Sequence, residues 1–228
     1  MLKGKRQVVY VMLITAIFFY SCEKEVISNL FDIDGNEYKT ITIGKQVWMA
    51  ENLKVTHFRD GTAITNVTDN AAWAALTTEA YCIYKNKTSN EYLSATLYNW
   101  YAVTNGHNLA PEGWHVPTDT EWTELETYLS NNGHNGTEGT ALKSTTFTGW
   151  GFNTDGTDDY GFTAVAGGRR TSSGGYDYRS TSGFFWSPPE YGSYGAWYRY
   201  RKLDKHSSDI HRGAGSKRSG FAVRLLRD

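Results

Sequence analysis

The residues with the most reactive side chains in this chain are two cysteines and six histidines. Cys82 lies in the apolar segment Ala80–Tyr84, and no basic residue adjoins it in the sequence. A thiol acts as a nucleophile when a neighbouring positive charge lowers its pKa, so we expect Cys82 to be buried and inert. His206 and His211 could share a loop, but no histidine has the HExxH spacing of a zinc-binding helix. The histidines therefore give little support for a metal site.

A cluster of oxygen-bearing side chains lies between residues 153 and 159. Asn153, Asp155 and Asp158 could supply the oxygen ligands that calcium prefers. An EF-hand loop needs glutamate at its twelfth position, and counting from Asn153 that position holds Ala164. We therefore favour a turn over a calcium site. Apart from calcium at this cluster, we expect no cofactor.

The tyrosine-rich segment between residues 176 and 200 is the best candidate for a binding surface. Aromatic faces beside polar groups suit sugar rings, whose C–H faces stack on them. The candidate ligand-binding residues are Tyr176, Tyr178, Arg179, Tyr191 and Tyr194. Hydrogen bonds to ligand carboxylates or sulfates could come from Arg169, Arg170, Arg179, Arg199 and Arg201. Solvated strand faces would explain the arginines equally well, whereas Trp186 and Trp197 are expected in the core.

No catalytic residue is predicted, because the chain contains no GxSxG, Walker or dinucleotide-binding motif. Charge also limits the function classes. Subtracting the three basic residues of the N-terminal leader from 23 leaves 20 against 24 acidic residues, a net charge of −4. This balance gives no indication of a nucleic-acid partner.

The N-terminus has the pattern of an export signal that ends in a lipidated cysteine. Three basic residues precede the apolar run Val8–Tyr20, and a serine and Cys22 follow it. The run is too short for a membrane span, so we expect residues 1–21 to be a lipoprotein signal peptide and Cys22 to be acylated. Residues 22–30 would then tether an outer membrane lipoprotein on the cell surface or the periplasmic face. An ordinary cleaved signal and an uncleaved anchor are the alternatives.

The best-defined local structure is a helix that begins after Thr118. Thr118 and Glu121 fit a capping box, in which each side chain binds a backbone amide of the first turn. Trp122, Leu125, Tyr128 and Leu129 then form one apolar stripe along the helix.

Other patterns predict a loop-rich α+β domain over residues 31–228. A β-hairpin is expected at Thr40–Met49, from alternation on both sides of Gly44. Helices are expected at Asp69–Leu76 and Leu97–Val103, and a short strand at Ala80–Tyr84. Many short strands separated by glycine are expected after Phe147.

Several of these segments together resemble the Fibrobacter succinogenes major paralogous domain. The resemblance rests on DIDGNEYKTITIGKQVWMAENL, LYNWYAV, PEGWHVPTDTEW, the Gly161-Phe162 pair, Gly168-x-Arg170, Phe185-Trp186-Ser187 and the terminal GFAVRLLRD. It implies a C-type-lectin-like fold, similar also to formylglycine-generating enzymes and other sulfatase-modifying factors. It further implies exported or surface lipoproteins and no established activity.

Two departures from the family pattern concern cysteine. Members of the family usually carry cysteines where this chain has Ala110 and Leu225. The resemblance therefore implies that Ala110 and Leu225 lie in contact without a disulfide between them. Formylglycine-generating chemistry also needs cysteines late in the chain, and none follows Cys82.

These observations favour a lipid-anchored, non-enzymatic binding or adhesion module whose ligand is a glycan or a surface protein. A degenerate enzyme of the sulfatase-modifying-factor type is one alternative. A structural cell-surface or fimbria-associated protein is the other.

Overall fold

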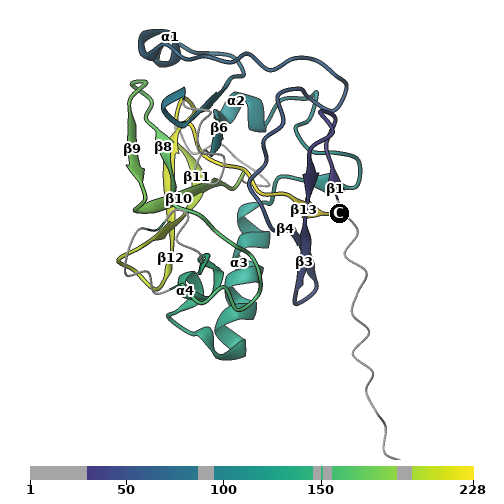
Figure 1. Ribbon diagram of the computed structural model, residues 1–228, viewed down its shortest axis with the longest axis vertical. Helices are drawn as coiled ribbons and strands as arrows, with labels where there is room; N and C mark the ends of the chain where they lie inside the picture. The colour runs from purple at the N-terminus through teal and green to yellow at the C-terminus, as the bar shows by residue number, and fades with distance from the viewer. Residues whose placement is uncertain (1–29, 87–94, 146–149, 151–155, 189–196) are drawn as a thin grey trace, which may run out of the picture.

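The computed structural model describes residues 30–86, 95–145, 150, 156–188 and 197–228. Figure 1 shows a mixed architecture in which short helices and several small sheets form one body. Most strand pairs are antiparallel, which confirms the predicted α+β class. Among the described helices, none is long and apolar enough to cross a membrane.

The largest sheet contains five strands in the order β12-β11-β10-β8-β9. Its strands are β8 (Gly167–Arg170), β9 (Tyr176–Arg179), β10 (Ser182–Trp186), β11 (Trp197–Asp204) and β12 (Ile210–Ser216). Neighbours are antiparallel except β8 and β10, which run parallel. Strands β10 and β11 are among the strands that the sequence predicts after Phe147.

A four-stranded sheet joins the N-terminal hairpin to the C-terminus. Its order is β3 (Thr40–Ile43), β4 (Gln46–Met49), β13 (Leu226–Arg227) and β7 (Trp114–His115). The antiparallel pairing of β3 with β4 confirms the predicted hairpin. Leu226 pairs with both Trp48 and His115, so the last strand lies between the hairpin and the segment that leads into α3.

Helix α3 (Asp119–Leu129) forms as the sequence predicts. The backbone amide of Thr118 donates to Glu121 at 2.8 Å, and the backbone amide of Glu121 donates to the Thr118 hydroxyl at 3.2 Å. This is the complete capping box. Trp122, Leu125 and Leu129 are fully buried, whereas Tyr128 is 36% exposed at the rim of the stripe.

The predicted helix at Leu97–Val103 is wrong in its first half. Thr96–Tyr98 is a strand, β6, which pairs with β5 (Tyr81–Ile83), and only Trp100–Val103 forms helix α2. Buried Asn99 separates the two, because its side-chain oxygen accepts from the amides of Ala80 and Ala102. An asparagine that caps a helix this way cannot lie inside it, although the apolar character of the segment does reflect deep burial.

The remaining described elements are short. They are β1 (Leu30–Phe31), β2 (Glu37–Tyr38), α1 (Asn70–Ala74), the 3₁₀ turn Tyr84–Asn86, the π-turn Ser130–His134 and α4 (Glu138–Leu142). Helix α1 lies within the helix predicted at Asp69–Leu76, and Asp69 caps it by accepting from the amide of Ala72 at 2.8 Å.

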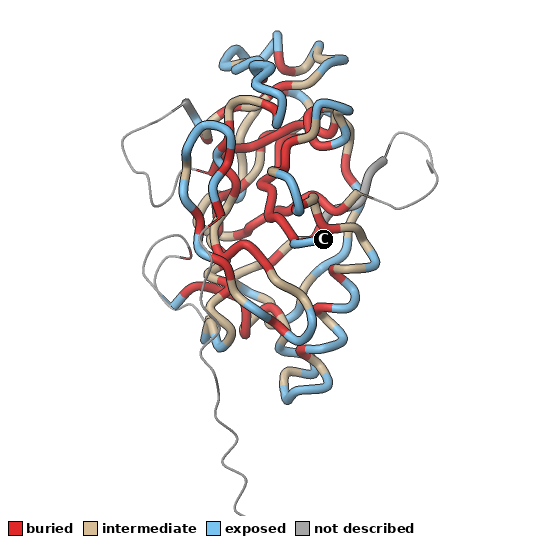
Figure 2. The backbone as a smooth tube through the Cα atoms, turned by 90° about the vertical axis from the view of Figure 1, so that its right-hand side faces the viewer, coloured by how far each residue is buried: buried red, intermediate tan, exposed pale blue. Residues whose placement is uncertain are grey.

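The hydrophobic core has two large parts, and β10 contributes to both. Phe184 and Trp186 belong to one cluster, while Phe185 belongs to the other with Trp122 of α3. A smaller third cluster surrounds Trp73. Figure 2 shows the buried backbone running through the middle of the body, with exposed residues around its periphery.

Ala110 and Leu225 are both fully buried and belong to the same hydrophobic cluster. Their surroundings are joined by pairing of β7 with β13 and by a hydrogen bond from the amide of Asp228 to the carbonyl of Gly113. The direct contact between Ala110 and Leu225 stays a prediction.

Candidate functional site

Five of the predicted site residues lie outside the described part of the chain. They are Cys22, Asn153, Asp155, Tyr191 and Tyr194. Asp158 is described, and its two carboxylate oxygens accept hydrogen bonds from the amide and the hydroxyl of Thr163 at 2.7 and 3.0 Å. Thr163 has a left-handed backbone conformation with φ 52°. Asp158 therefore holds a turn, and no group of three metal-ligating side chains occurs among the described residues.

The remaining candidates divide between two sides of β9. Tyr176 packs against Tyr84 with ring centroids 5.1 Å apart, and the Arg179 guanidinium lies 5.6 Å from the Tyr84 ring. The Arg170 guanidinium lies 4.9 Å from the Tyr176 ring, and burial raises the pKa of Tyr176 above its usual value. Tyr176 is thus part of the packing around the third cluster.

Tyr178 lies on the other side of β9, and 46% of it is exposed. Its backbone is left-handed, with φ 60°, a conformation that is rare for a bulky residue. Two hydrogen bonds hold it there, because the Tyr178 carbonyl accepts from the amide of Thr181 at 3.1 Å and from its hydroxyl at 2.9 Å. The turn thereby separates Tyr178 from Tyr176 and directs its ring over the sheet.

Two positive charges and a buried ring lie close to the Tyr178 ring. Its centroid is 4.9 Å from the Arg169 guanidinium and 5.5 Å from Lys202 Nζ. The Phe184 ring is 5.7 Å away. Because Phe184 is almost fully buried, these contacts support the sheet side of the Tyr178 ring, and the exposed part of the ring is turned to solvent.

Each of the two cations also has a carboxylate partner. Arg169 donates through Nε and Nη2 to the two oxygens of Asp177 at 2.8 and 3.1 Å. Lys202 Nζ lies 2.7 Å from Asp204. We name the five residues Arg169, Asp177, Tyr178, Lys202 and Asp204 the Tyr178 patch.

Strand register explains how the patch is assembled. Arg169 pairs with Asp177 across β8 and β9, and Phe184 pairs with Lys202 across β10 and β11. Gly168 pairs with Gly183, which sets Arg169 beside Phe184 in the next position. Four strands therefore contribute one cross-strand row beneath Tyr178.

Asp204 is ionised at neutral pH. Burial alone would raise its pKa, but hydrogen bonds from Lys202, from the amide of His206 and from Ser182 lower it to about 2. The Lys202–Asp204 pair is therefore a permanent pair of opposite charges at neutral pH.

Arg170, predicted as a ligand-binding residue, is instead fully buried. Its guanidinium donates to the carbonyls of Val67, Thr68, Asp69 and Gly174 at 2.5–3.0 Å. It also lies 4.3 Å from the Trp73 ring. The prediction was wrong because adjacent residues of a strand point to opposite faces, and Arg170 points inward.

Arg201 is a second correction, since its side chain is also fully buried. It donates to the carboxylates of Asp119 and Glu126 on α3, which fastens the helix to β11. The side chain of Arg199 lies outside the described part of the structure. Arg224, which the prediction did not include, is buried in the same manner as Arg170 and donates to the carbonyls of Met49, Phe162 and Thr163.

The sequence profile of the Fibrobacter succinogenes major domain matches residues 41–227 of this chain. The chain belongs to the Fibrobacter succinogenes major domain family. No curated protein and no solved structure matches it. The match includes every strand of the five-stranded sheet, and therefore the Tyr178 patch lies within the Fibrobacter succinogenes major domain itself.

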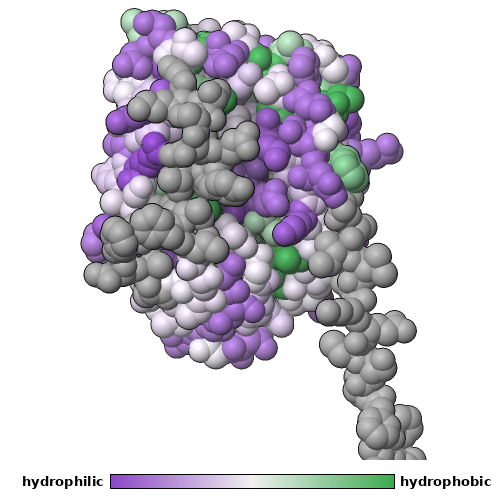
Figure 3. Space-filling model, viewed as in Figure 1, coloured by the Kyte–Doolittle hydropathy of each residue, from purple (hydrophilic) through white to green (hydrophobic). Residues whose placement is uncertain are grey.

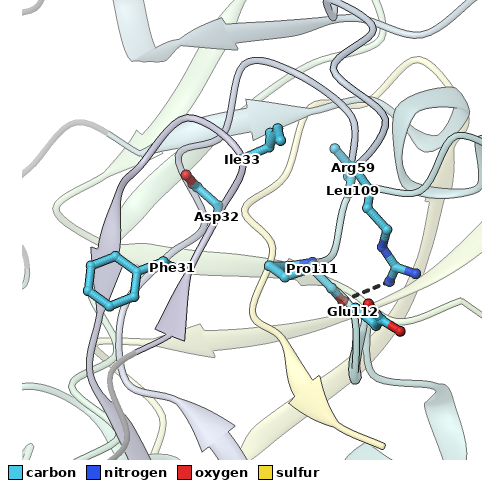
Figure 4. A pocket seen from close by; sticks show the side chains of 7 residues that line it. All are labelled: Phe31, Asp32, Ile33, Arg59, Leu109, Pro111 and Glu112. Carbon is cyan, nitrogen blue, oxygen red and sulfur yellow. Dashed lines mark hydrogen bonds between the residues drawn. The ribbon is translucent and has the colours of Figure 1, made fainter.

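This Fibrobacter succinogenes major domain also has a groove of about 230 Å³ beside β1 (Figure 4). Phe31 and Ile33 on its wall are 55% and 54% exposed. Figure 4 shows the Arg59 guanidinium turned to the carbonyl of Pro111, to which it donates at 2.7 Å. Asp32 accepts from the Tyr38 hydroxyl at 2.6 Å. Because these polar groups bind the protein itself, the groove offers mainly apolar side chains to a partner.

Figure 3 shows how polar and apolar residues are distributed on one face of the surface. The face drawn in Figure 3 is mostly hydrophilic, with small and separate hydrophobic areas. A broad apolar patch would indicate a large protein interface, and this face of the Fibrobacter succinogenes major domain does not have one outside the residues drawn in grey.

Cys82 and His115 have structural surroundings in the Fibrobacter succinogenes major domain. Cys82 is fully buried, as predicted, and burial raises the pKa of its thiol. His115 lies between two carboxylates, with Nε2 2.9 Å from Glu121 and Nδ1 2.6 Å from Asp228. It therefore joins β7 to the first turn of α3 and to the C-terminal residue.

Sequence reasoning missed Asp177, Lys202 and Asp204 as members of the patch. Asp177 lies between two candidate tyrosines, and Lys202 and Asp204 have the two-residue spacing of one strand face. These were the available signals. The pairing of β10 with β11, which brings Lys202 to Tyr178, could not be obtained from the sequence of this Fibrobacter succinogenes major domain.

Proposed function

We propose that this protein is an exported, lipid-anchored module that binds a glycan through the Tyr178 patch and catalyses no reaction. In this proposal Cys22 carries the lipid, residues 22–30 form the tether and the folded domain is C-type-lectin-like. The lipoprotein pattern of the N-terminus supports the anchor, and family membership supports the domain assignment.

The observation that carries the proposal is the exposed ring of Tyr178, supported from beneath and surrounded by donors and acceptors. A rigid aromatic ring loses little conformational entropy when a ligand covers it. The carboxylates of Asp177 and Asp204 accept hydrogen bonds, and Arg169 and Lys202 donate them. A sugar ring needs this combination, because it has an apolar C–H face and hydroxyl groups around its edge.

A glycan array tests the proposal directly. The full chain is purified in detergent and applied as the native protein, as Tyr178→Ala and as Phe31→Ala. Phe31 is the matched control, because it is an exposed aromatic residue of β1, and β1 lies across the molecule from β9 in Figure 1. We expect the native protein and Phe31→Ala to bind the same glycans, and Tyr178→Ala to lose at least tenfold in affinity.

Two results would contradict this proposal. Loss of binding in Phe31→Ala with retention in Tyr178→Ala would place the ligand in the groove beside β1. A native protein that binds no glycan on the array would remove glycan binding altogether and would favour a structural or protein-binding role.

The anchor has a test of its own. Cells that express the native chain or Cys22→Ser are labelled with an alkyne analogue of palmitate, and the protein is isolated and detected by fluorescence. We expect label only in the native chain. Equal labelling of the two proteins would reject acylation of Cys22.

A further inference from the structure

The charges of the Tyr178 patch cancel within the patch. Asp177 accepts both hydrogen bonds that the Arg169 Nε and Nη2 groups direct at its oxygens, at 2.8 and 3.1 Å. Asp204 lies 2.7 Å from Lys202 Nζ and its pKa of about 2 keeps it ionised. The two cations beside the ring and their two carboxylate partners thus have a net charge of zero.

Several other basic residues of the C-terminal part of the chain are held away from the Tyr178 patch. The C-terminal part of the chain is rich in arginine and lysine, but the structure places much of this charge in internal contacts. Arg201 and Arg224 are buried, and Arg212 pairs with Asp119. The Arg179 guanidinium lies over Tyr84, on the side of β9 away from Tyr178.

An acidic sugar would therefore meet an unfavourable surface. Its carboxylate or sulfate would bind a cation that already has Asp177 or Asp204 as its partner, and would therefore lie beside that carboxylate. Like charges at that distance repel. A hydroxyl group has no such difficulty, because it donates to a carboxylate and accepts from a guanidinium or ammonium group without breaking the existing pair.

We propose that the ligand of the Tyr178 patch is an uncharged glycan, bound through a neutral sugar ring. This proposal rests on the proposed glycan binding at Tyr178. The C–H face of the ring covers the exposed part of Tyr178, its hydroxyls donate to Asp177 and Asp204, and they accept from Arg169 and Lys202. Each ion pair thus offers the sugar hydroxyls a hydrogen-bond donor and an acceptor whose positions are already fixed.

Matched pairs of polysaccharides test the charge of the ligand. The full chain in detergent is titrated with dextran and dextran sulfate, and with polygalacturonate before and after reduction of its carboxyl groups, by isothermal calorimetry. The glycans that bind on the array are titrated alongside them at 50 and 500 mM NaCl. We expect neutral glycans to bind at least tenfold more tightly than their charged counterparts, with less than a twofold change over this salt range.

The variants Tyr178→Ala and Asp177→Asn complete the experiment, with Phe31→Ala as the control. We expect the first two to weaken binding of the neutral glycan at least tenfold and threefold, respectively, and the control to leave it unchanged. If charged glycans bind more tightly, lose affinity at 500 mM NaCl and bind better to Asp177→Asn, the neutral ligand is wrong although glycan binding at Tyr178 stands. If neither class binds, both proposals fail.

Discussion

Arg169 and Arg170 are neighbours in the chain, yet the two faces of β8 use them in different ways. Arg170 is fully buried and its charge is met by four backbone carbonyls. Arg169 is partly exposed and its charge is met by the carboxylate of Asp177. One cation is surrounded by fixed dipoles inside the protein, and the other belongs to an ion pair at the surface.

The buried arginines have a structural role, whereas the charges of the surface pairs are accessible to a ligand. Carbonyls that bind Arg170 belong to residues 67–69 and to Gly174, so one side chain joins segments that are distant in the sequence. Arg224 does the same for Met49 and Phe162. Burial lowers the pKa of Arg224 to about 9, which still leaves it charged at neutral pH. The surface pairs lie within one strand or join adjacent strands, and they are partly exposed.

The largest expected effect is on stability, when Arg170 is replaced. In Arg170→Met we expect the free energy of unfolding to fall by at least about 3 kcal/mol, because several buried carbonyls lose their donor. In Arg169→Met, the matched change on the other face, it should fall by less than about 1 kcal/mol. Urea denaturation followed by tryptophan fluorescence measures both. Equal losses in the two variants would show that the faces of β8 do not differ in this way.

Such a contrast between adjacent arginines could not be predicted from their sequence. The capped helix α3 and the β3–β4 hairpin were predictable, because the signals at Thr118 and Gly44 are local. Alternation along β8 shows that Arg169 and Arg170 point to opposite faces. Which face is buried depends on Trp73 and on the backbone of residues 67–69, and these meet Arg170 only in the folded chain.

The candidate site was predictable only in part for a similar reason. Tyrosines in a polar segment pointed to β9, and Tyr178 is exposed as a binding residue should be. The left-handed turn at Tyr178, which puts Tyr176 on the opposite side, has no glycine or asparagine to indicate it. The strand β6 was missed because a run of large apolar residues suits a buried helix or a buried strand equally well.

A cation that is paired with carboxylates should make stability depend on pH, whereas one bound by carbonyls should not. Hydrogen bonding to Glu121 is the largest cause of a raised pKa for His115, and Asp228 adds to it. A raised pKa in the folded state stabilises the protein below the unfolded value of about 6.5. That contribution is lost as the pH rises through the higher pKa of the folded state.

We therefore expect His115→Gln to lower the free energy of unfolding by about 1 kcal/mol at pH 5.5, and by much less at pH 9. His107→Gln is the control, because the His107 side chain is 54% exposed and among the described residues its ion-pair partner is Asp60. We expect this variant to lower the free energy of unfolding by less. Urea denaturation at the two pH values measures the difference. An effect of His115→Gln that is equal at both would mean that its carboxylate partners do not stabilise the folded protein.

Salt should weaken the Arg169–Asp177 ion pair at the surface, but it should not weaken the hydrogen bonds from buried Arg170 to backbone carbonyls. At 500 mM NaCl the Debye length is below about 8 Å, so the Arg169–Asp177 pair is screened at its exposed edge. We expect the destabilisation caused by Arg169→Met to shrink by about 0.5 kcal/mol between 50 and 500 mM NaCl. The destabilisation caused by Arg170→Met should stay constant over the same range. A salt response of equal size in both variants would remove the proposed distinction between the two faces.

The smallest expected effect concerns two residues with a left-handed backbone conformation. One lies beside the Tyr178 patch and the other beside buried Arg224. Ser180 adjoins the patch with φ 62°, and within the described residues its hydroxyl makes no hydrogen bond. Thr163 has φ 52°, but its hydroxyl binds Asp158 and its carbonyl accepts from buried Arg224. Glycine relieves the steric cost of this conformation, although it also adds freedom to the unfolded chain.

We accordingly expect Ser180→Gly to raise the free energy of unfolding by about 0.3 kcal/mol. Thr163→Gly should lower it, because the hydrogen bond from the hydroxyl to Asp158 is lost and the turn that presents a carbonyl to Arg224 is loosened. Urea denaturation measures both changes. Free-energy changes of opposite sign would show that the Ser180 side chain does not offset the steric cost of its backbone conformation, whereas the Thr163 side chain does. If both variants stabilise the protein, the hydroxyl of Thr163 contributes nothing to holding the buried arginine in place.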